Sequence, residues 1–222
     1  MRLVRTVTVV TANLGRGATV EQFEDNVDRI MRKAPGKSVF IGWQEIDEDD
    51  KPREMPYLKK VLRDTHRLVG TNTKVPIAVP RTFEIKRPFI EKASDGVKRL
   101  QPDRYVVRAL VHPKGSPKRL VNHTNTHFGR NIEALADSRR EMHQFVEEDI
   151  QRSRAGWLTA DVNAHNYRAL ARPERRLVNG GLDIIRAYES DDVKFRQLDR
   201  GSINLVGDGH NAHWTRMQII WS

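Results

Sequence analysis

Short apolar runs typical of β-strands recur along the whole chain, and only a few helical patterns interrupt them. Apolar or β-branched residues fill the runs at residues 4–12, 38–43, 65–69, 75–79, 82–85, 105–111, 119–128, 156–160, 182–185 and 217–221. Helical spacing of apolar residues predicts long helices over 20–31 and 132–150 and a short helix at 57–62. Turn-linked strands mixed with a few helices predict a layered α/β (α+β) domain.

Length and local signals give the domain organisation. The chain has 222 residues, which is the length of one large domain. Thr19 fits the N-cap of the first helix, because Gln22 follows it at the spacing of a capping box. Residues 86–102 are polar and irregular, but they are too few to separate two domains. We therefore expect a single domain over residues 1–222.

Composition excludes several classes of protein. The chain has no cysteine, which excludes a disulfide scaffold, thiolate catalysis and cysteine-ligated zinc. No segment reaches the roughly 20 apolar residues of a membrane-spanning helix. The first residues lack the apolar core of a signal peptide. We therefore expect a cytoplasmic protein that has no membrane partner and is a monomer by default.

Basic residues outnumber acidic ones. The 39 lysines and arginines and the 29 aspartates and glutamates give a formal net charge of +10. Such a surplus attracts polyanions, and phosphate contacts supply most of the non-specific affinity for nucleic acid. The basic residues are scattered and form no polybasic block. The charge alone is equally compatible with an ordinary soluble protein from an arginine-rich lineage.

Polar residues that are costly to bury follow or end several of the predicted strands. They are Asn13, Gln44, Glu45, Asn125, His127, Asp161 and Asn163, and near the C-terminus Asp183, Asp208, His210 and His213. Each has an ordinary explanation by itself, such as a turn cap, a solvated loop or a satisfied core histidine. Strand ends of a layered sheet converge in space, however, and ligand sites of α/β folds lie there. The coincidence therefore predicts a site.

The residue types in this set point to phosphoester hydrolysis at a hard metal ion. Carboxylates without thiolates are oxygen ligands suited to Mg²⁺, Mn²⁺ or Ca²⁺, and Glu45 is the best candidate ligand. Asp161 and Asn163 are two residues apart, which places both on one face of an extended segment. Asp161 could orient a water while Asn163 donates to a phosphate oxygen. A nearby histidine can hold the phosphate or a developing oxyanion.

Five segments carry most of these residues: 11–14 (TANL), 41–45 (IGWQE), 125–128 (NTHF), 158–164 (LTADVNA) and 181–185 (GLDII). In chain order they resemble motifs of the endonuclease/exonuclease/phosphatase superfamily, whose members include pancreatic-type deoxyribonucleases and abasic-site endonucleases. Ala160 stands where the family pattern has glycine. The resemblance implies a four-layered α/β sandwich of two packed mixed sheets flanked by helices, with the site at one edge of both sheets.

The segment 207–213 (GDGHNAH) departs from the Ser-Asp-His that ends the family pattern. With His210 as the catalytic histidine, Asp208 remains nearby as the acid that supports it. With His213 as the histidine, the preceding residue is Ala212 and the pair is lost. We favour His210 and keep His213 as the alternate.

The resemblance also implies roles for the residues that match. Mg²⁺ or Mn²⁺ would be bound by Glu45, with support from Asn13 and Asp208. The phosphate would be contacted by Asn13, His127 and Asn163. The catalytic set would be His127, Asp161, Asn163, Asp208 and His210.

We expect a divalent-metal-dependent phosphodiesterase, a nuclease that acts on nucleic acid, with DNA favoured over RNA. Two alternatives stay open. One is the same chemistry on a small or lipid phosphoester, as in the phosphatases of the superfamily. The other, motivated by the interrupted last motif, is a binding module of the same fold with weakened catalysis.

Overall fold

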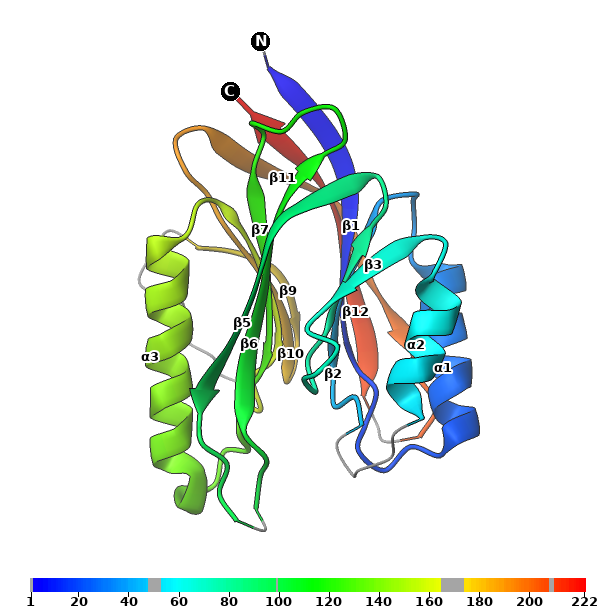
Figure 1. Cartoon of the computed structure of the whole chain (residues 1–222), viewed down its shortest axis with the longest axis vertical. Helices are drawn as coiled ribbons and strands as arrows, with labels where there is room; N and C mark the ends of the chain where they lie inside the picture. The colour runs from blue at the N-terminus through cyan, green and yellow to red at the C-terminus, as the bar shows by residue number, and fades with distance from the viewer. Residues whose placement is uncertain (1, 48–52, 99, 165–173, 208–209) are drawn as a thin grey trace.

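The computed structural model describes residues 2–47, 53–98, 100–164, 174–207 and 210–222. These residues form two six-stranded sheets that pack face to face, with helices on both outer sides (Figure 1). Helices α1 (Val20–Lys33) and α2 (Glu54–Leu62) cover one sheet, and α3 (Ala136–Arg152), preceded by a 3₁₀ turn at Glu133–Leu135, covers the other. The predicted four-layered α/β sandwich of two mixed sheets is confirmed. No helix among these residues is long and apolar enough to cross a membrane.

The first sheet has the strand order β11-β12-β1-β2-β4-β3. Its strands are β1 (Leu3–Asn13), β2 (Val39–Gln44), β3 (His66–Val69), β4 (Ile77–Pro80), β11 (Val193–Asn204) and β12 (Asn211–Trp221). β1 is parallel to β2, and Asn13 pairs in register with Gln44. On its other side β1 is antiparallel to β12, which therefore begins at the edge where β1 ends.

The second sheet has the strand order β5-β6-β7-β8-β10-β9. Its strands are β5 (Phe83–Ser94), β6 (Arg104–Pro113), β7 (Val121–His127), β8 (Gly156–Asp161), β9 (Glu174–Gly180) and β10 (Asp183–Tyr188). β7 is parallel to β8, and His127 pairs with Asp161. β10 is antiparallel to β8 and starts with Asp183 opposite Asp161. Each sheet thus repeats one plan, a central parallel pair beside an antiparallel strand.

The core between the sheets is apolar and aromatic. Phe40 of β2 packs edge-on against Trp157 of β8, with ring centroids 5.0 Å apart, and both side chains are fully buried. Burying a large apolar side chain contributes roughly 1.5–3 kcal/mol. One further hydrophobic cluster lies between each sheet and its helices. Trp43 is a buried member of the first and Phe128 of the second. The packing of one sheet on the other is what brings their edges together.

Helix α1 begins where the sequence predicts. Thr19 accepts a hydrogen bond from the backbone N–H of Gln22, and the Gln22 side chain accepts one from the Thr19 backbone N–H, which is the reciprocal capping box. The helix buries Phe23, Val27 and Ile30 against the first sheet. This fixes the glycine-rich turn between β1 and α1 beside the end of β1.

Three strands that the sequence analysis missed or cut short, β5, β9 and β11, lie at sheet edges, whereas β10 and β12, which it also cut short, lie inside the sheets. The prediction ended a strand at residue 85 and left 86–102 irregular, whereas β5 runs on to Ser94. β9 and β11 were not predicted at all. Edge strands have one free side and cover less core, so β5 and β11 carry mostly exposed polar side chains and lack an apolar run. Their pairing with β6 and β12 is visible only in the folded sheet.

Candidate active site

The polar residues gather where the two parallel strand pairs end. β1 and β2 of the first sheet end at Asn13 and Gln44, and β7 and β8 of the second end at His127 and Asp161. Two antiparallel strands begin at the same edge. β10 starts with Asp183 and β12 follows His210 directly. Strand polarity therefore collects side chains from six segments at one edge of the sandwich.

Asp161 lies at the centre of this set, and it is only 1% exposed. Its Oδ2 accepts a hydrogen bond of 2.8 Å from the side-chain amide of Asn13, which belongs to the other sheet. Its Oδ1 accepts one of 2.8 Å from the backbone N–H of Asn163. Asp161 is thus held in a fixed orientation by one donor from each sheet.

Asn163 reaches the site by a turn, which differs from the extended segment that the sequence analysis assumed. Its φ is +49°, in the left-handed region that asparagine tolerates better than most residues. The turn directs its side-chain amide to the carbonyl of Phe128 at 2.9 Å and to within 3.0 Å of the His127 ring. Asn163 therefore bridges the ends of β7 and β8.

His127 is held from both sides of its ring. Its Nδ1 lies 3.1 Å from Nη1 of Arg104, and because a guanidinium can only donate, Nδ1 accepts. Nε2 lies 3.0 Å from the amide nitrogen of Asn163, 3.5 Å from Oδ2 of Asp161 and 3.7 Å from Oε1 of Glu45. Arg104 and Asn163 thus fix the ring so that its Nε2 edge faces the carboxylates.

Glu45 follows β2 and turns toward the site. Its φ is +61°, and its Oε2 accepts a hydrogen bond of 2.8 Å from the backbone N–H of Arg16 in the glycine-rich turn after β1. The side chain is mostly buried but keeps 16% exposure. A left-handed backbone at a non-glycine residue is costly, of order 1–3 kcal/mol, and is typical of functional positions.

His210 and Asp183 form an ion pair between the sheets. Nδ1 of His210 lies 3.2 Å from Oδ2 of Asp183. The hydrogen bond to Asp183 is the main cause that raises the pKa of His210 to about 9. Burial is the main cause that raises the pKa of Asp183 to about 6, against the opposing effect of His210. At pH 7 the pair therefore carries an imidazolium and a carboxylate.

Below the site, Asn125 and Gln44 brace the sheets. Oδ1 of Asn125 accepts hydrogen bonds from Nε2 of Gln44 at 2.6 Å and from the Thr159 hydroxyl at 2.9 Å. Its amide donates to the carbonyl of Trp43 at 2.8 Å. All this is possible because residue 42 is glycine, since a Cβ there would lie 2.0 Å from the Thr159 hydroxyl oxygen. These two motif residues hold the scaffold rather than face the site.

Solved structures share this architecture, although no family model and no curated protein matches the sequence. An endonuclease/exonuclease/phosphatase protein from Bacteroides vulgatus superposes with a TM-score of 0.71 over 96% of this chain and 98% of its own, at 14% identity. TDP2 from D. rerio, complexed with single-strand DNA product, gives 0.72 over 96% and 98%, at 11% identity. The human Nocturnin catalytic domain with bound sulfate gives 0.68 over 98% and 97%, at 13% identity. The chain has the endonuclease/exonuclease/phosphatase fold.

Within this endonuclease/exonuclease/phosphatase fold, five of the residues singled out from the sequence come together: Asn13, Glu45, His127, Asp161 and Asn163. His210 joins them through Asp183. Asp208, expected to be the acid beside His210, lies outside the described residues. The carboxylate that the structure places on His210 is Asp183.

His213, the alternate histidine, is the third residue of β12 and pairs with Thr11 of β1. Its ring packs against Gly180 of β9, and a Cβ on that glycine would lie 2.3 Å from the His213 Nε2. Together with Arg200 and Ser202 it lines a separate hollow of about 350 Å³. Burial lowers the pKa of His213, so its ring is neutral at pH 7.

The sequence analysis singled out Asp183 but gave it no role, and it missed Arg104. Asp183 occurs in one of the matched segments, but its antiparallel register opposite Asp161 is what directs it to His210. Arg104 is 6% exposed, and the sequence holds no sign that this arginine is buried. An arginine that begins a strand two residues after a proline reads equally well as a solvated turn residue.

The site of this fold also has a donor set that suits a divalent cation. Ligand atoms of Asp161, Asp183 and His210 lie within 4.8 Å of one another. Oδ1 of Asp183 is buried, and no donor among the described residues reaches it. A buried carboxylate oxygen without a donor is a natural position for a cation. This cluster contains neither Glu45 nor Asn13, the ligands expected from the sequence. Glu45 is nearby, because Nε2 of His127 lies 3.7 Å from Oε1 of Glu45 and 3.5 Å from Oδ2 of Asp161.

Proposed function

We propose that this chain is a Mg²⁺- or Mn²⁺-dependent phosphodiesterase that cleaves nucleic acid, with residues 1–222 as one catalytic domain. The observation that carries the proposal is the His210–Asp183 ion pair, held beside Asp161, Asn13 and His127 at the joint edge of the two sheets. A buried carboxylate with fixed donors, a charged histidine and a second, oriented histidine are the groups that phosphoester hydrolysis needs. The shared fold adds support.

The cation would be held by carboxylate oxygens from Glu45, Asp161 and Asp183. His210 is not a ligand in this scheme, because an imidazolium has no lone pair to offer. A bound Mg²⁺ or Mn²⁺ would polarise the phosphoryl group and offset its developing charge. Three carboxylates in one region, with Oδ1 of Asp183 buried and without a donor among the described residues, support a bound cation.

The side chains then divide the work. Asp161, held in place by Asn13 and the backbone of Asn163, orients the attacking water and accepts its proton. His127 and the amide of Asn163 contact the non-bridging phosphate oxygens. His210, as a cation at pH 7, stabilises the extra negative charge of the transition state, and Asp183 keeps it protonated.

Two observations favour nucleic acid, and DNA over RNA, as the substrate class. The net charge of +10 attracts a polyanion. A structural neighbour, TDP2 from D. rerio, was solved in complex with single-strand DNA product. A small or lipid phosphoester is the second candidate, and salt distinguishes the two. Nucleic-acid binding weakens steeply with salt because counterions are released, whereas a small monoester shows little dependence.

The test is cleavage of plasmid DNA and of labelled DNA and RNA oligonucleotides with Mg²⁺ or Mn²⁺, with and without EDTA. The wild type is compared with Asp161→Ala and with the control Asp191→Ala. Asp191 is an exposed residue in the turn between β10 and β11. We expect cleavage by the wild type and by Asp191→Ala, and loss of about 10²-fold or more in Asp161→Ala. Equal cleavage by all three, or cleavage that survives EDTA, removes the proposed mechanism. Binding without turnover of any phosphoester identifies a binding module instead.

A further inference from the structure

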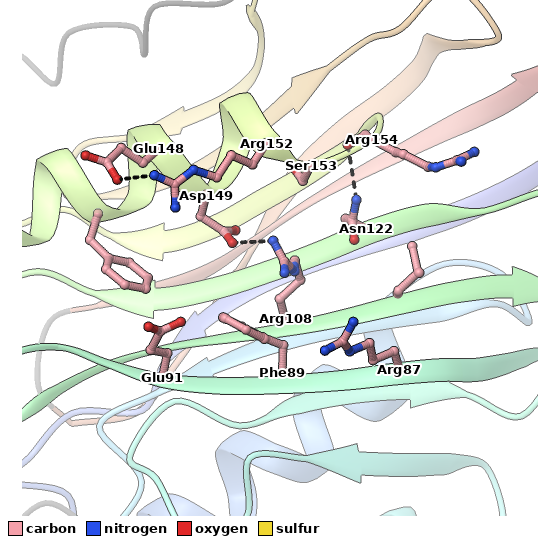
Figure 2. A pocket seen from close by; sticks show the side chains of 12 residues that line it. Arg87, Phe89, Glu91, Arg108, Asn122, Glu148, Asp149, Arg152, Ser153 and Arg154 are labelled. Atoms are coloured by element: carbon pink, nitrogen blue, oxygen red, sulfur yellow. Dashed lines mark hydrogen bonds and ion pairs between the residues drawn. The ribbon is translucent and has the colours of Figure 1, made fainter.

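A second pocket, of about 430 Å³, lies between helix α3 and the outer face of β5 and β6 (Figure 2). It is far from the candidate active site. Asn122, which lines it, and His127 stand at the two ends of β7, five residues and thus about 17 Å apart. They also point to opposite faces of the sheet, because side chains alternate along a strand. The pocket is therefore independent of the site described above.

The floor of the pocket is an ion pair with one unused oxygen. Arg108 of β6 donates to Oδ1 of Asp149 of α3, and its guanidinium also lies 4.5 Å above the ring centre of Phe89. Asp149 is only 8% exposed, yet its Oδ2 has no hydrogen-bond partner among the described residues. A buried acceptor without a donor is energetically unfavourable. It is the position at which a ligand N–H would be bound.

The two ends of the pocket carry opposite charge. Arg87 and Arg154 lie at one end, and no carboxylate among the described residues pairs with either guanidinium (Figure 2). Glu91 lies at the other end. Figure 2 shows the two side chains directed apart at this end, and an exposed guanidinium suits a phosphate, which arginine binds with several parallel hydrogen bonds.

Apolar surface lies between these ends. The pocket is lined there by Phe89, Leu110 and Phe145. A ligand that satisfies all three zones needs an anionic group, a flat apolar body and an N–H donor, in that order. A pocket of a few hundred cubic ångströms holds one small molecule of this kind.

We infer that this pocket binds a mononucleotide, with its phosphate at the end that carries Arg87 and Arg154, its base against Phe89 and a base N–H on Oδ2 of Asp149. The inference does not rest on the proposed hydrolase function. It assigns a second, remote nucleotide site on the back of the second sheet. A free mononucleotide and the terminal nucleotide of a strand share this chemistry, and the experiment below distinguishes them.

The experiment is a titration of the full-length protein in EDTA, followed by calorimetry and by backbone amide shifts. The probes are AMP, CMP, ribose 5-phosphate, inorganic phosphate and a 5′-phosphorylated DNA tetramer. We expect AMP and CMP to bind and to shift amides of residues 87–91, 108–110 and 149–154. We expect ribose 5-phosphate to bind at least tenfold more weakly, because it lacks the base. If the tetramer shifts the same amides and binds with higher affinity than AMP, the occupant is a strand end. If the tetramer binds with lower affinity than AMP, the occupant is the free mononucleotide.

Two variants locate the contacts, and a third is the control. Arg87→Gln/Arg154→Gln removes the two exposed guanidiniums and leaves the Arg108–Asp149 pair intact, so it should fold normally and lose at least tenfold in affinity for every phosphate probe. Asp149→Asn keeps an acceptor for Arg108 but can present its amide to the base, so AMP should weaken to the level of ribose 5-phosphate. Arg196→Gln, an exposed arginine on β11, should change nothing.

Three outcomes overturn the inference. The first is no binding of AMP or CMP at millimolar concentration. The second is shifts confined to residues 13, 45, 127 and 161, which would place the nucleotide in the candidate active site. The third is unchanged affinity in Arg87→Gln/Arg154→Gln with its native circular dichroism spectrum retained.

Discussion

Nδ1 of His210 lies 3.2 Å from Oδ2 of Asp183, and the two residues come from different sheets. His210 precedes β12 of the first sheet, whereas Asp183 begins β10 of the second. The pair sits at the site edge, and each residue changes the proton affinity of the other. This relationship makes the charge of the site measurable.

The pH dependence of activity should report this pair. Activity needs Asp183 ionised and His210 protonated, so it should fall below pH about 6, where Asp183 takes up a proton, and above pH about 9, where His210 loses one. The expected profile of kcat/KM against pH is bell-shaped, with apparent pKa values that belong to the pair. In Asp183→Asn the alkaline limb should move down toward the ordinary histidine pKa of about 6.5. An alkaline limb that stays near 9 in this variant, as it should in Asp191→Asn, contradicts the role of the pair.

Asn13→Ala removes a hydrogen bond that crosses the sandwich. Its amide donates to Oδ2 of Asp161, and without it a buried carboxylate loses one of its donors. We expect the free energy of unfolding to fall by about 1–3 kcal/mol and kcat to fall by about 10–100-fold. Urea denaturation and steady-state kinetics measure the two effects. Asn204→Ala, at an exposed residue of β11, is the matched control and should be neutral; full activity in Asn13→Ala would mean that Asp161 needs no such support.

Arg104→Gln tests a residue that acts through His127. The guanidinium lies 3.1 Å from Nδ1 of His127 and fixes the orientation of the ring. We expect kcat to fall by about 10–100-fold with little change in KM, and Arg196→Gln to have no effect. A double-mutant cycle with His127→Gln separates positioning from stability. If Arg104 works through His127, its substitution should add little in the His127→Gln background, whereas two fully additive losses would assign Arg104 an independent role.

Gly42→Ala tests the brace beneath the site. The new Cβ would lie 2.0 Å from the Thr159 hydroxyl oxygen and 2.4 Å from Oδ1 of Asn125, so the hydrogen bonds between these residues must shift. We expect a loss of about 1–3 kcal/mol in the free energy of unfolding from overpacking, measured by thermal or urea denaturation. Gly115→Ala is the comparison, because its Cβ would meet no atom within 4 Å and its φ of +75° adds only local strain. Equal losses in both would show that the close approach at Gly42 is unimportant.

The central strands and most of the site positions could be predicted from the sequence. β1, β2 and β8 are buried on both faces, so they read as continuous apolar runs and their ends mark the polar residues that follow. β9 and β11 could not be predicted in this way, because an edge strand has few buried positions. Chain order also cannot show which acid faces which histidine. Asp208 is nearest to His210 in sequence, but the register of β10 on β8 brings Asp183 to it.

Contacts that define the site join the two sheets: Asn13 to Asp161, Glu45 toward His127, and His210 to Asp183. Neither sheet holds a complete set of these groups. A partly folded chain with one sheet formed would therefore have half a site and no means of hydrolysis. Recovery of activity during refolding should coincide with the docking of the two sheets. The fraction of active molecules should then equal the fraction in which the sheets have docked. On the proposed function, competence for phosphoester hydrolysis would therefore require complete folding.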